Sequence, residues 1–109
     1  MSELINREDG LLRLGGNEQI FKTLLRRFVD TPYYEELCVH IANNNLIDAK
    51  RGAHAIKGTA GNLGLTALFE IATSLDSALK AGDDFQLIFE DFKIIYEDTV
   101  IEIENYITE

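Results

Sequence analysis

The sequence predicts an all-helical protein, and three observations support this. A single proline, Pro32, occurs in 109 residues, and proline is poorly tolerated inside a helix. The apolar residues recur every three or four positions, which is the α-helical period. Glycines and asparagines separate the periodic segments, where helices end and begin. Because short links favour antiparallel neighbours, we expect an up-and-down antiparallel four-helix bundle of the last four helices, with two N-terminal helices packed across one end.

Three helices are expected in the first 45 residues. The first covers residues 6–14 and ends at Gly15 and Gly16, because glycine readily takes the left-handed conformation that closes a helix. Asn17 caps the second helix. Thr31 caps the third, with Pro32 in its first turn, and this helix ends within residues 43–45. The inner faces of the second and third helices are apolar: Ile20, Phe21, Leu24, Leu25 and Phe28, then Tyr33 or Tyr34, Leu37 and Ile41.

Three longer helices follow. The fourth covers residues 46–62 and Gly64 ends it, Thr66 and Gly82 bound the fifth, and the capping-box spacing of Asp83 and Gln86 begins the last. The buried side of the fourth helix consists mainly of small residues: Ala49, Ala53, Ile56, Ala60 and Leu63. The inner faces of the last two helices are larger: Leu68, Ile71, Ala72, Leu75, Ala78 and Leu79, then Phe85, Ile88, Phe89, Phe92, Ile95, Tyr96, Ile103 and Tyr106.

Length and composition indicate one domain over residues 1–109. A chain of this size, 46% apolar, buries enough surface to fold without disulfides or a structural metal. The lone Cys38 forms no internal bridge, and no Cys/His cluster has zinc-ligand spacing. No segment approaches the roughly 20 apolar residues that cross a bilayer, and the start shows no basic region followed by an apolar one. We expect a monomeric cytoplasmic protein with no membrane association.

The charge balance argues against nucleic acid as a partner. The chain has 10 Lys and Arg against 19 Asp and Glu, a net charge of −9, and an acidic protein is repelled by a phosphate backbone. All of the net charge comes from residues 68–109, which carry 2 basic and 11 acidic residues. Neither a P-loop nor a Gly-x-Gly-x-x-Gly turn is present. The chain therefore has no nucleotide-binding module with which to phosphorylate itself.

The chemically informative segment is residues 50–62, centred on His54. On a helix, the residues that lie within about 60° of His54 are cations and glycines. The small apolar residues of this helix occupy the opposite, buried face, so His54 is expected to point to solvent. The residues that share its face are Lys50, Arg51, Lys57, Gly58 and Gly61.

The glycines of this helix need an explanation, because each costs roughly 1 kcal/mol relative to alanine. Gly58 and Gly61 remove side chains from the space beside the imidazole, which leaves room for a bulky group. Next to Lys50 and Lys57 that group should be anionic, and a phosphoryl group satisfies both conditions. A neutral histidine near pH 7 is a competent nucleophile for it, and exposure allows donor and acceptor to reach the same nitrogen in line.

These residues resemble the histidine phosphotransfer (HPt) domain of bacterial multistep phosphorelays. The resemblance rests on the His54-x-x-Lys57-Gly58 run, Gly64 ten residues after the histidine, and Leu75-Asp76 in the next helix. It covers nearly the whole chain from Gly10 to about Gly82. The upstream segments that carry it are Gly10-Leu11, Leu14-Gly15-Gly16-Asn17 and Leu24-Leu25-Arg26-Arg27-Phe28.

The resemblance implies a phosphoryl carrier rather than an enzyme. His54 would receive the group from the aspartyl phosphate of one receiver domain and pass it to the aspartate of another, with Lys57 as the neighbouring cation and Gly58 as the clearing residue. It also implies a hybrid sensor histidine kinase and response-regulator receiver domains as partners, with Mg²⁺ on the receiver domain and no cofactor or metal here. Position 76 often carries Gln or Glu in this family. Asp76 is shorter, which leaves a contact with His54 open.

Some of these residues also fit other interpretations. Lys50 and Arg51 fit a solvated face paired with Asp48, and Gly52 and Gly61 fit close helix packing. His40 has no Lys or Gly beside it, so we expect a structural role for it. A di-iron carboxylate bundle is excluded, because neither histidine has a glutamate three residues before it. The remaining alternative is a non-catalytic helical adaptor that docks a partner through the face around His54.

Overall fold

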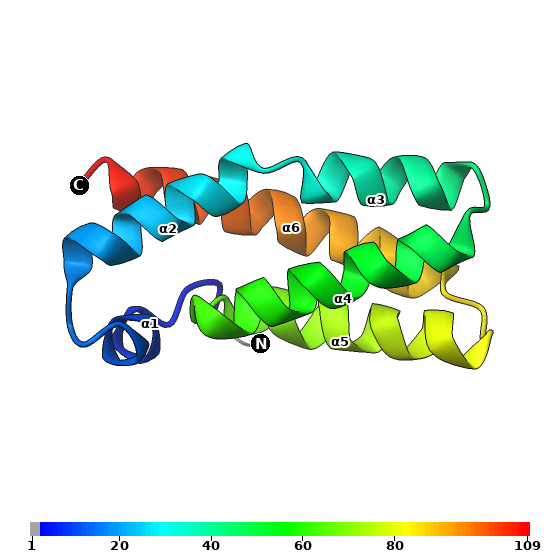
Figure 1. Ribbon diagram of the computed structural model, residues 1–109, viewed down its shortest axis with the longest axis horizontal. Helices are drawn as coiled ribbons and strands as arrows, with labels where there is room; N and C mark the ends of the chain where they lie inside the picture. Colours follow the sequence, from blue (N-terminus) through cyan, green and yellow to red (C-terminus); the bar gives the residue numbers. More distant parts are fainter. Residues whose placement is uncertain (1–2) are drawn as a thin grey trace.

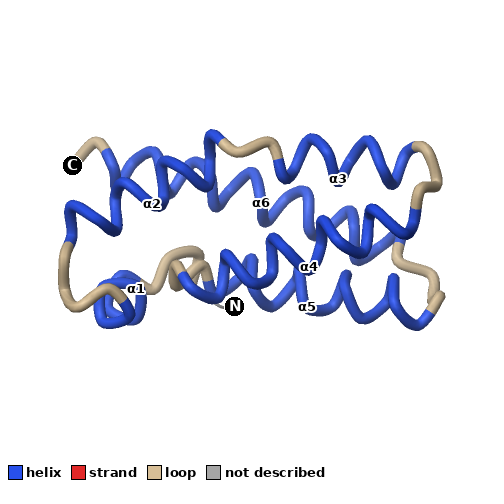
Figure 2. The backbone as a smooth tube through the Cα atoms, viewed as in Figure 1, coloured by secondary structure: helices blue, strands red, loops and turns tan. Residues whose placement is uncertain are grey.

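The computed structural model describes residues 3–109, and this part of the chain folds into six α-helices without strands (Figures 1 and 2). The molecule is elongated, with extents of 40 × 24 × 20 Å. The helices are α1 (Arg7–Arg13), α2 (Glu18–Asp30), α3 (Tyr33–Ala42), α4 (Leu46–Asn62), α5 (Thr66–Ala81) and α6 (Gln86–Ile107). The all-helical prediction is confirmed.

The last four helices run back and forth along the long axis. α3 is followed by α4 in the opposite direction, α5 reverses again, and α6 returns toward the end where α2 begins (Figure 1). Contacts join α3 to α4, α4 to α5, and α5 to α6. The small residues predicted for the inner face of α4 are fully buried: Ala49, Ala53 and Ala60 have no exposed surface. They allow α3 and α5 to approach α4 closely.

α1 lies across one end of the molecule, as expected, and Figure 1 shows it nearly end-on. The segment before it is tied to the turn between α4 and α5, where the Asn6 backbone N–H donates to the Gly64 carbonyl at 2.7 Å. Gly64 has φ +69°, and a Cβ there would lie 2.6 Å from the Asn6 carbonyl oxygen. This position therefore requires glycine for both its conformation and its close approach.

The expectation that α2 also crosses the end is wrong. α2 lies along α6, nearly in line with α3 (Figure 1). The reason is the length of α6, whose 22 residues extend beyond α3 and need an apolar cover at their C-terminal end. The ring of Phe21 packs 5.7 Å from that of Tyr106, and the ring of Phe28 packs 6.0 Å from that of Tyr96.

Several helix starts differ from the prediction. The Thr31 hydroxyl donates back to the Arg27 carbonyl at 2.7 Å instead of capping α3, and α3 has Pro32 at its N-cap. Leu65, and not Thr66, precedes α5. Asp83 and Gln86 form no capping box, since the Gln86 backbone N–H donates to Asp84 Oδ1 at 3.0 Å. On the inner face of α2, Ile20 departs from the prediction and is 47% exposed.

Candidate functional site

His54 lies in the middle of α4 with its side chain directed to solvent. The side chain is 67% exposed, whereas Ala53 before it and Ile56 after it are fully buried. Because α4 buries its alanine side, the opposite side must face water. The predicted exposure of His54 is confirmed.

The carboxylate of Asp76 is the point where the site converges. Asp76 comes from α5, is 2% exposed, and places Oδ2 3.7 Å from Nδ1 of His54. The same oxygen lies 3.9 Å from Nζ of Lys57 and 3.0 Å from Nζ of Lys80. The structure thus brings together His54 and Lys57 of α4 with Asp76 and Lys80 of α5.

The balance of charge explains how Asp76 can be buried. An unpaired carboxylate is costly to remove from water, and here two ammonium groups lie within ion-pair distance of it. Lys80 is the closer, on the next turn of the same helix. The other oxygen, Oδ1, is buried without a hydrogen-bond partner among the described residues. Ion pairs with the lysines therefore hold the Asp76 carboxylate in place more than hydrogen bonds do.

The imidazole is oriented by this arrangement. A contact of 3.7 Å is too long for a hydrogen bond but short enough for electrostatic attraction. A carboxylate beside Nδ1 favours the tautomer that carries its proton on Nδ1. The lone pair is then on Nε2, the nitrogen not engaged by Asp76. His54 can thus act as a nucleophile through Nε2.

The two glycines near His54 differ in their surroundings. A Cβ added at Gly58 would meet no atom within 4 Å, whereas one at Gly61 would come within 3.1 Å of the Phe69 ring. Gly58 therefore leaves open space beside the histidine, as expected. Gly61 instead serves close packing of α4 against α5, the alternative already noted for it.

A cleft extends from Gly58 toward α1. Its volume is about 420 Å³, and its lining comes from α1, α4 and the beginning of α5. Arg13 and Asp9 of α1 form an ion pair of 3.1 Å at its edge, and Phe69, 37% exposed, contributes an apolar surface. The space beside the histidine is therefore continuous with a shallow depression.

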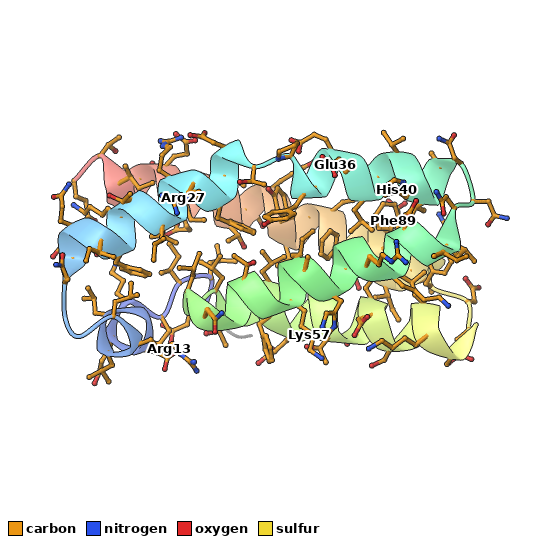
Figure 3. All side chains as sticks on the ribbon, in the orientation of Figure 1. Arg13, Arg27, Glu36, His40, Lys57 and Phe89 are labelled. Atoms are coloured by element: carbon orange, nitrogen blue, oxygen red, sulfur yellow. The ribbon has the colours of Figure 1, made fainter. Side chains whose placement is uncertain are left out.

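Other candidate residues lie apart from this cluster. The Arg51 guanidinium is 3.6 Å from Asp48, which is the solvated pairing considered above. Lys50 is half-buried and makes no ion pair within residues 3–109. Gly52 packs on α3, where a Cβ would lie 3.5 Å from Leu37. Figure 3 shows His40 on α3 and Lys57 on the side of α4 near α5, so the two histidines belong to different environments.

Lys80 is the site residue that the sequence analysis missed. The signal was present, because Asp76 and Lys80 stand four residues apart on one helix, the spacing of an ion pair. Phe69 was also missed, and its position three residues after Thr66 gave no indication that it would cover Gly61.

Two further properties of the described chain bear on the site. Within residues 3–109, no three His, Cys, Asp or Glu side chains gather in a way that could hold a metal ion. Over the same residues, none of the helices has the length and apolar character needed to span a membrane.

Comparison with known proteins gives one match. A family model described as the Hpt domain matches residues 22–106, a stretch that contains α3, α4, α5, α6 and most of α2. No curated protein and no solved structure matches the chain.

Proposed function

Because the chain belongs to the Hpt domain family, we propose that it carries a phosphoryl group on His54 between two receiver domains. Hpt domains take part in histidine phosphotransfer in two-component signalling, together with receiver domains and histidine kinases, and act as phosphoryl carriers without catalytic activity of their own. The observation that carries the assignment to His54 is its 67% exposed side chain beside the buried carboxylate of Asp76.

The proposed transfer follows from the geometry of the imidazole. The lone pair of His54 Nε2 attacks the phosphorus of an aspartyl phosphate in line, and the bond from phosphorus to the aspartate oxygen breaks. The electron pair of that bond leaves with the aspartate carboxylate. The Nδ1 proton stays on the ring, which becomes cationic, and the carboxylate of Asp76 at 3.7 Å stabilises this charge. Transfer to a second receiver domain is the same step in reverse.

The lysines support the phosphoryl group rather than the ring. Lys57 and Lys80 are 30% and 57% exposed, so their ammonium groups can leave Asp76 and contact phosphoryl oxygens. An ammonium supplies charge without fixed geometry, which suits a group that must arrive and depart. Gly58 leaves the attacking side open. We assign no cofactor or metal to this chain, and Mg²⁺ belongs to the receiver domain.

The proposal includes the architecture and the setting. We assign the fold to an up-and-down antiparallel four-helix bundle of α3, α4, α5 and α6, supported by the contacts between successive helices and their alternating directions (Figure 1). A single domain over residues 1–109, monomeric and cytoplasmic, fits a carrier that must meet two partners in turn. Direct partners are response-regulator receiver domains, with a hybrid sensor histidine kinase as the first source of phosphate.

The test is phosphotransfer from a receiver domain loaded with labelled phosphate. We expect an acid-labile, base-stable adduct on the wild-type chain and none on His54→Gln. The matched control is His40→Gln, which removes the other histidine and should leave labelling unchanged. Labelling that persists in His54→Gln, or is lost in His40→Gln, would reject His54 as the acceptor. Absence of labelling with every receiver domain tried would favour the adaptor function.

A further inference from the structure

α6 carries a second apolar stripe on the face opposite its buried one. Leu87, Ile94 and Ile101 are 83%, 59% and 58% exposed, and they are spaced seven residues apart. Seven residues make nearly two turns, so each side chain is displaced by about 20° from the one before it. The three side chains therefore lie within about 40° of one another and span about 21 Å of the helix. Phe92 and Ile103, on the other side, have no exposed surface. We call Leu87, Ile94 and Ile101 the α6 outer stripe.

Acidic residues border the α6 outer stripe on both sides. Glu90 and Glu97 lie on one side and Asp91 and Asp98 on the other, all within about 60° of Ile94. Asp91 and Asp98 make no ion pair in the part of the chain that the structure describes, while Glu90 pairs with Lys93 at 3.0 Å. Lys93 is the one basic residue of α6 against six acidic ones. Most of this negative charge is thus free to meet external cations.

The stripe continues into a depression at its C-terminal end. Ile101 lines a cavity of about 320 Å³ together with apolar and aromatic side chains from the break between α2 and α3, among them Val29 and Tyr34. Glu35 and Glu97 stand in the same lining. The apolar surface therefore ends in a pocket that has acidic residues in its lining, just as acidic residues border the stripe.

We propose that the α6 outer stripe binds a cationic amphipathic helix of a partner protein. Apolar residues at heptad spacing, with flanking charges, are the pattern by which one helix packs along another and selects its partner by charge. A partner helix with leucine-like residues on one edge and Lys or Arg beside them would cover the stripe and pair with Asp91 and Asp98. A second copy is disfavoured because two acidic faces would oppose each other. Anionic lipid and nucleic acid would be repelled.

The position of the stripe makes it independent of the His54 site. The site lies on α4 and α5, whereas α6 packs against α5 on one side and α2 on the other. In Figure 1, α4 passes in front of α6. A helix bound along the outer face of α6 would leave His54 open, so this partner need not be a receiver domain.

The test measures binding of a helical probe to the full chain. The probe is a peptide of about 21 residues with leucine at heptad positions and lysine beside them, compared with the same peptide carrying glutamate in place of lysine. Isothermal titration should show binding of the lysine peptide only, and binding should weaken as NaCl rises from about 50 to about 500 mM. Replacing Leu87, Ile94 and Ile101 together by Gln should weaken it by about tenfold or more.

The control variant replaces three other exposed apolar residues that do not line up: Leu12, Val39 and Ile47, which are 72%, 55% and 67% exposed. It should bind the lysine peptide like the wild type. Circular dichroism should show that both triple variants keep the wild-type helicity. No binding of the lysine peptide, equal binding of both peptides, or equal loss in the control would overturn the proposal. So would concentration-dependent dimerisation that the stripe variant abolishes, which would identify a second copy as the occupant.

Discussion

Asp76 connects the residues of the site although it is the most buried of them. Its Oδ2 atom lies within 4 Å of one imidazole nitrogen and two ammonium groups. A single carboxylate therefore orients the histidine and also pairs with two lysines. In the transfer that we propose, the incoming phosphoryl group would compete with Asp76 for the two lysines. In the same proposal, the carboxylate would then face a cationic ring at His54.

At this scale the sequence predicted part of the site. His54, Lys57 and Gly58 were predictable because they lie on one helix, where a fixed angular period places them on a common face. The meeting of Asp76 with His54 was left open, because it depends on how closely α4 and α5 approach. A close approach is permitted by Gly61 of α4, where a Cβ would lie 3.1 Å from the Phe69 ring of α5. Helical periodicity does not encode the distance between the two helices.

Substitutions at Gly58 should affect stability and phosphotransfer in different ways. A Cβ at this position would meet nothing within 4 Å, so Gly58→Ala should raise stability by about 1 kcal/mol, the difference in helix propensity. Gly58→Gln should also keep the helical content, but its longer side chain should enter the space beside His54 and slow phosphotransfer by about tenfold or more. Circular dichroism and single-turnover transfer kinetics measure the two effects. Unchanged transfer in Gly58→Gln would contradict the clearing role.

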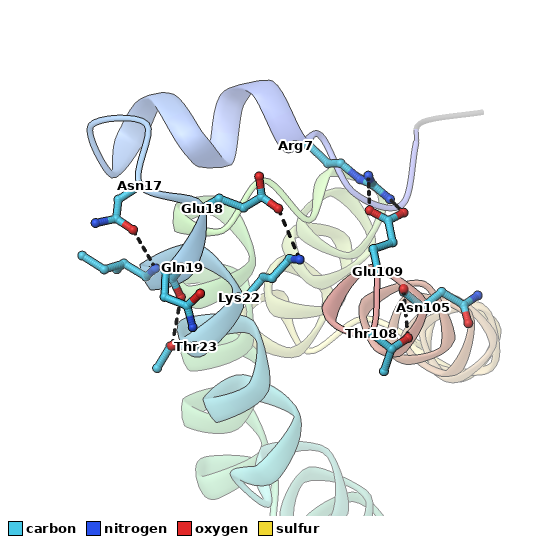
Figure 4. Close-up of polar contacts among 10 residues, drawn as sticks. Arg7, Asn17, Glu18, Gln19, Lys22, Thr23, Asn105, Thr108 and Glu109 are labelled. Carbon is cyan, nitrogen blue, oxygen red and sulfur yellow. Dashed lines mark hydrogen bonds and ion pairs between the residues drawn. The ribbon is translucent and has the colours of Figure 1, made fainter.

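Asparagine is the capping residue at three helix starts. The Oδ1 atoms of Asn6, Asn17 and Asn45 accept the backbone N–H three residues later, and Figure 4 shows this contact for Asn17. The threonines expected to cap α3 and α5 do not do so, because their hydroxyls donate to carbonyls of the preceding segment. Helix positions were thus predictable from apolar periodicity. The capping residues were less predictable, because a threonine hydroxyl can donate a hydrogen bond to a nearby backbone carbonyl instead of capping the helix.

The position of α2 beside α6 could not be predicted from its sequence, although its inner face could. Phe21, Leu25 and Phe28 were correctly predicted to face inward, and all are buried. The stripe shows which side of a helix is covered but not by which neighbour. That was decided by the length of α6 and its aromatic residues, which provide the matching surface.

Asn17, which caps α2, should contribute more to stability than Thr66, which the sequence predicted as a cap for α5. Asn17→Ala removes the acceptor for the Ile20 N–H, a hydrogen bond of 3.0 Å, and should lower the free energy of unfolding by about 1 kcal/mol. Thr66→Ala should cost less, because its hydroxyl makes only a 3.4 Å contact with the Gly64 carbonyl. Urea unfolding of the two variants beside the wild type gives the comparison. A larger loss for Thr66→Ala would contradict the capping assignment.

Across the whole molecule, distant parts of the chain are held by contacts that cross between helices. Arg7 forms two hydrogen bonds to Glu109, 3.0 and 2.9 Å long (Figure 4), and lies over the Tyr106 ring. These bonds lower the pKa of the Glu109 carboxyl. Midway along the molecule, Tyr34 of α3 stacks on Tyr96 of α6, with 4.1 Å between the ring centroids and an angle of 6° between the ring planes. One end of the elongated fold and its middle are therefore both connected to the C-terminal helix or the residues that follow it.

The stacked Tyr34 and Tyr96 predict that the folded protein loses stability at alkaline pH. Burial raises the pKa of Tyr96 from 10.0 to about 12 and also raises that of Tyr34. A raised pKa in the folded state contributes stability that is complete below pH 10 and is lost as the pH rises toward 12. We expect the urea midpoint to fall across this range, and to fall less in Tyr96→Phe. Burial also raises the pKa of Tyr106, so ultraviolet titration should show Tyr34, Tyr96 and Tyr106 ionising late. Titration of all four tyrosines together near pH 10 would contradict this.

The net negative charge of the molecule comes from a segment of the chain that does not include His54. All of the net charge of −9 arises from residues 68–109, and much of it lies on α6. The α4 surface around His54 is cationic through Lys57, with Lys80 added from α5. An overall charge that excludes nucleic acid is therefore compatible with a local site for one phosphoryl group.

The most direct test of the central proposal is to locate the phosphate on the protein. The chain, labelled with ¹⁵N in its histidines, is phosphorylated by a receiver domain and observed by ¹⁵N and ³¹P magnetic resonance. We predict one phosphoryl group, on Nε2 of His54, because Asp76 Oδ2 lies 3.7 Å from Nδ1 and keeps the proton there. Phosphate on Nδ1 of His54, or on His40, would contradict the mechanism derived from this structure.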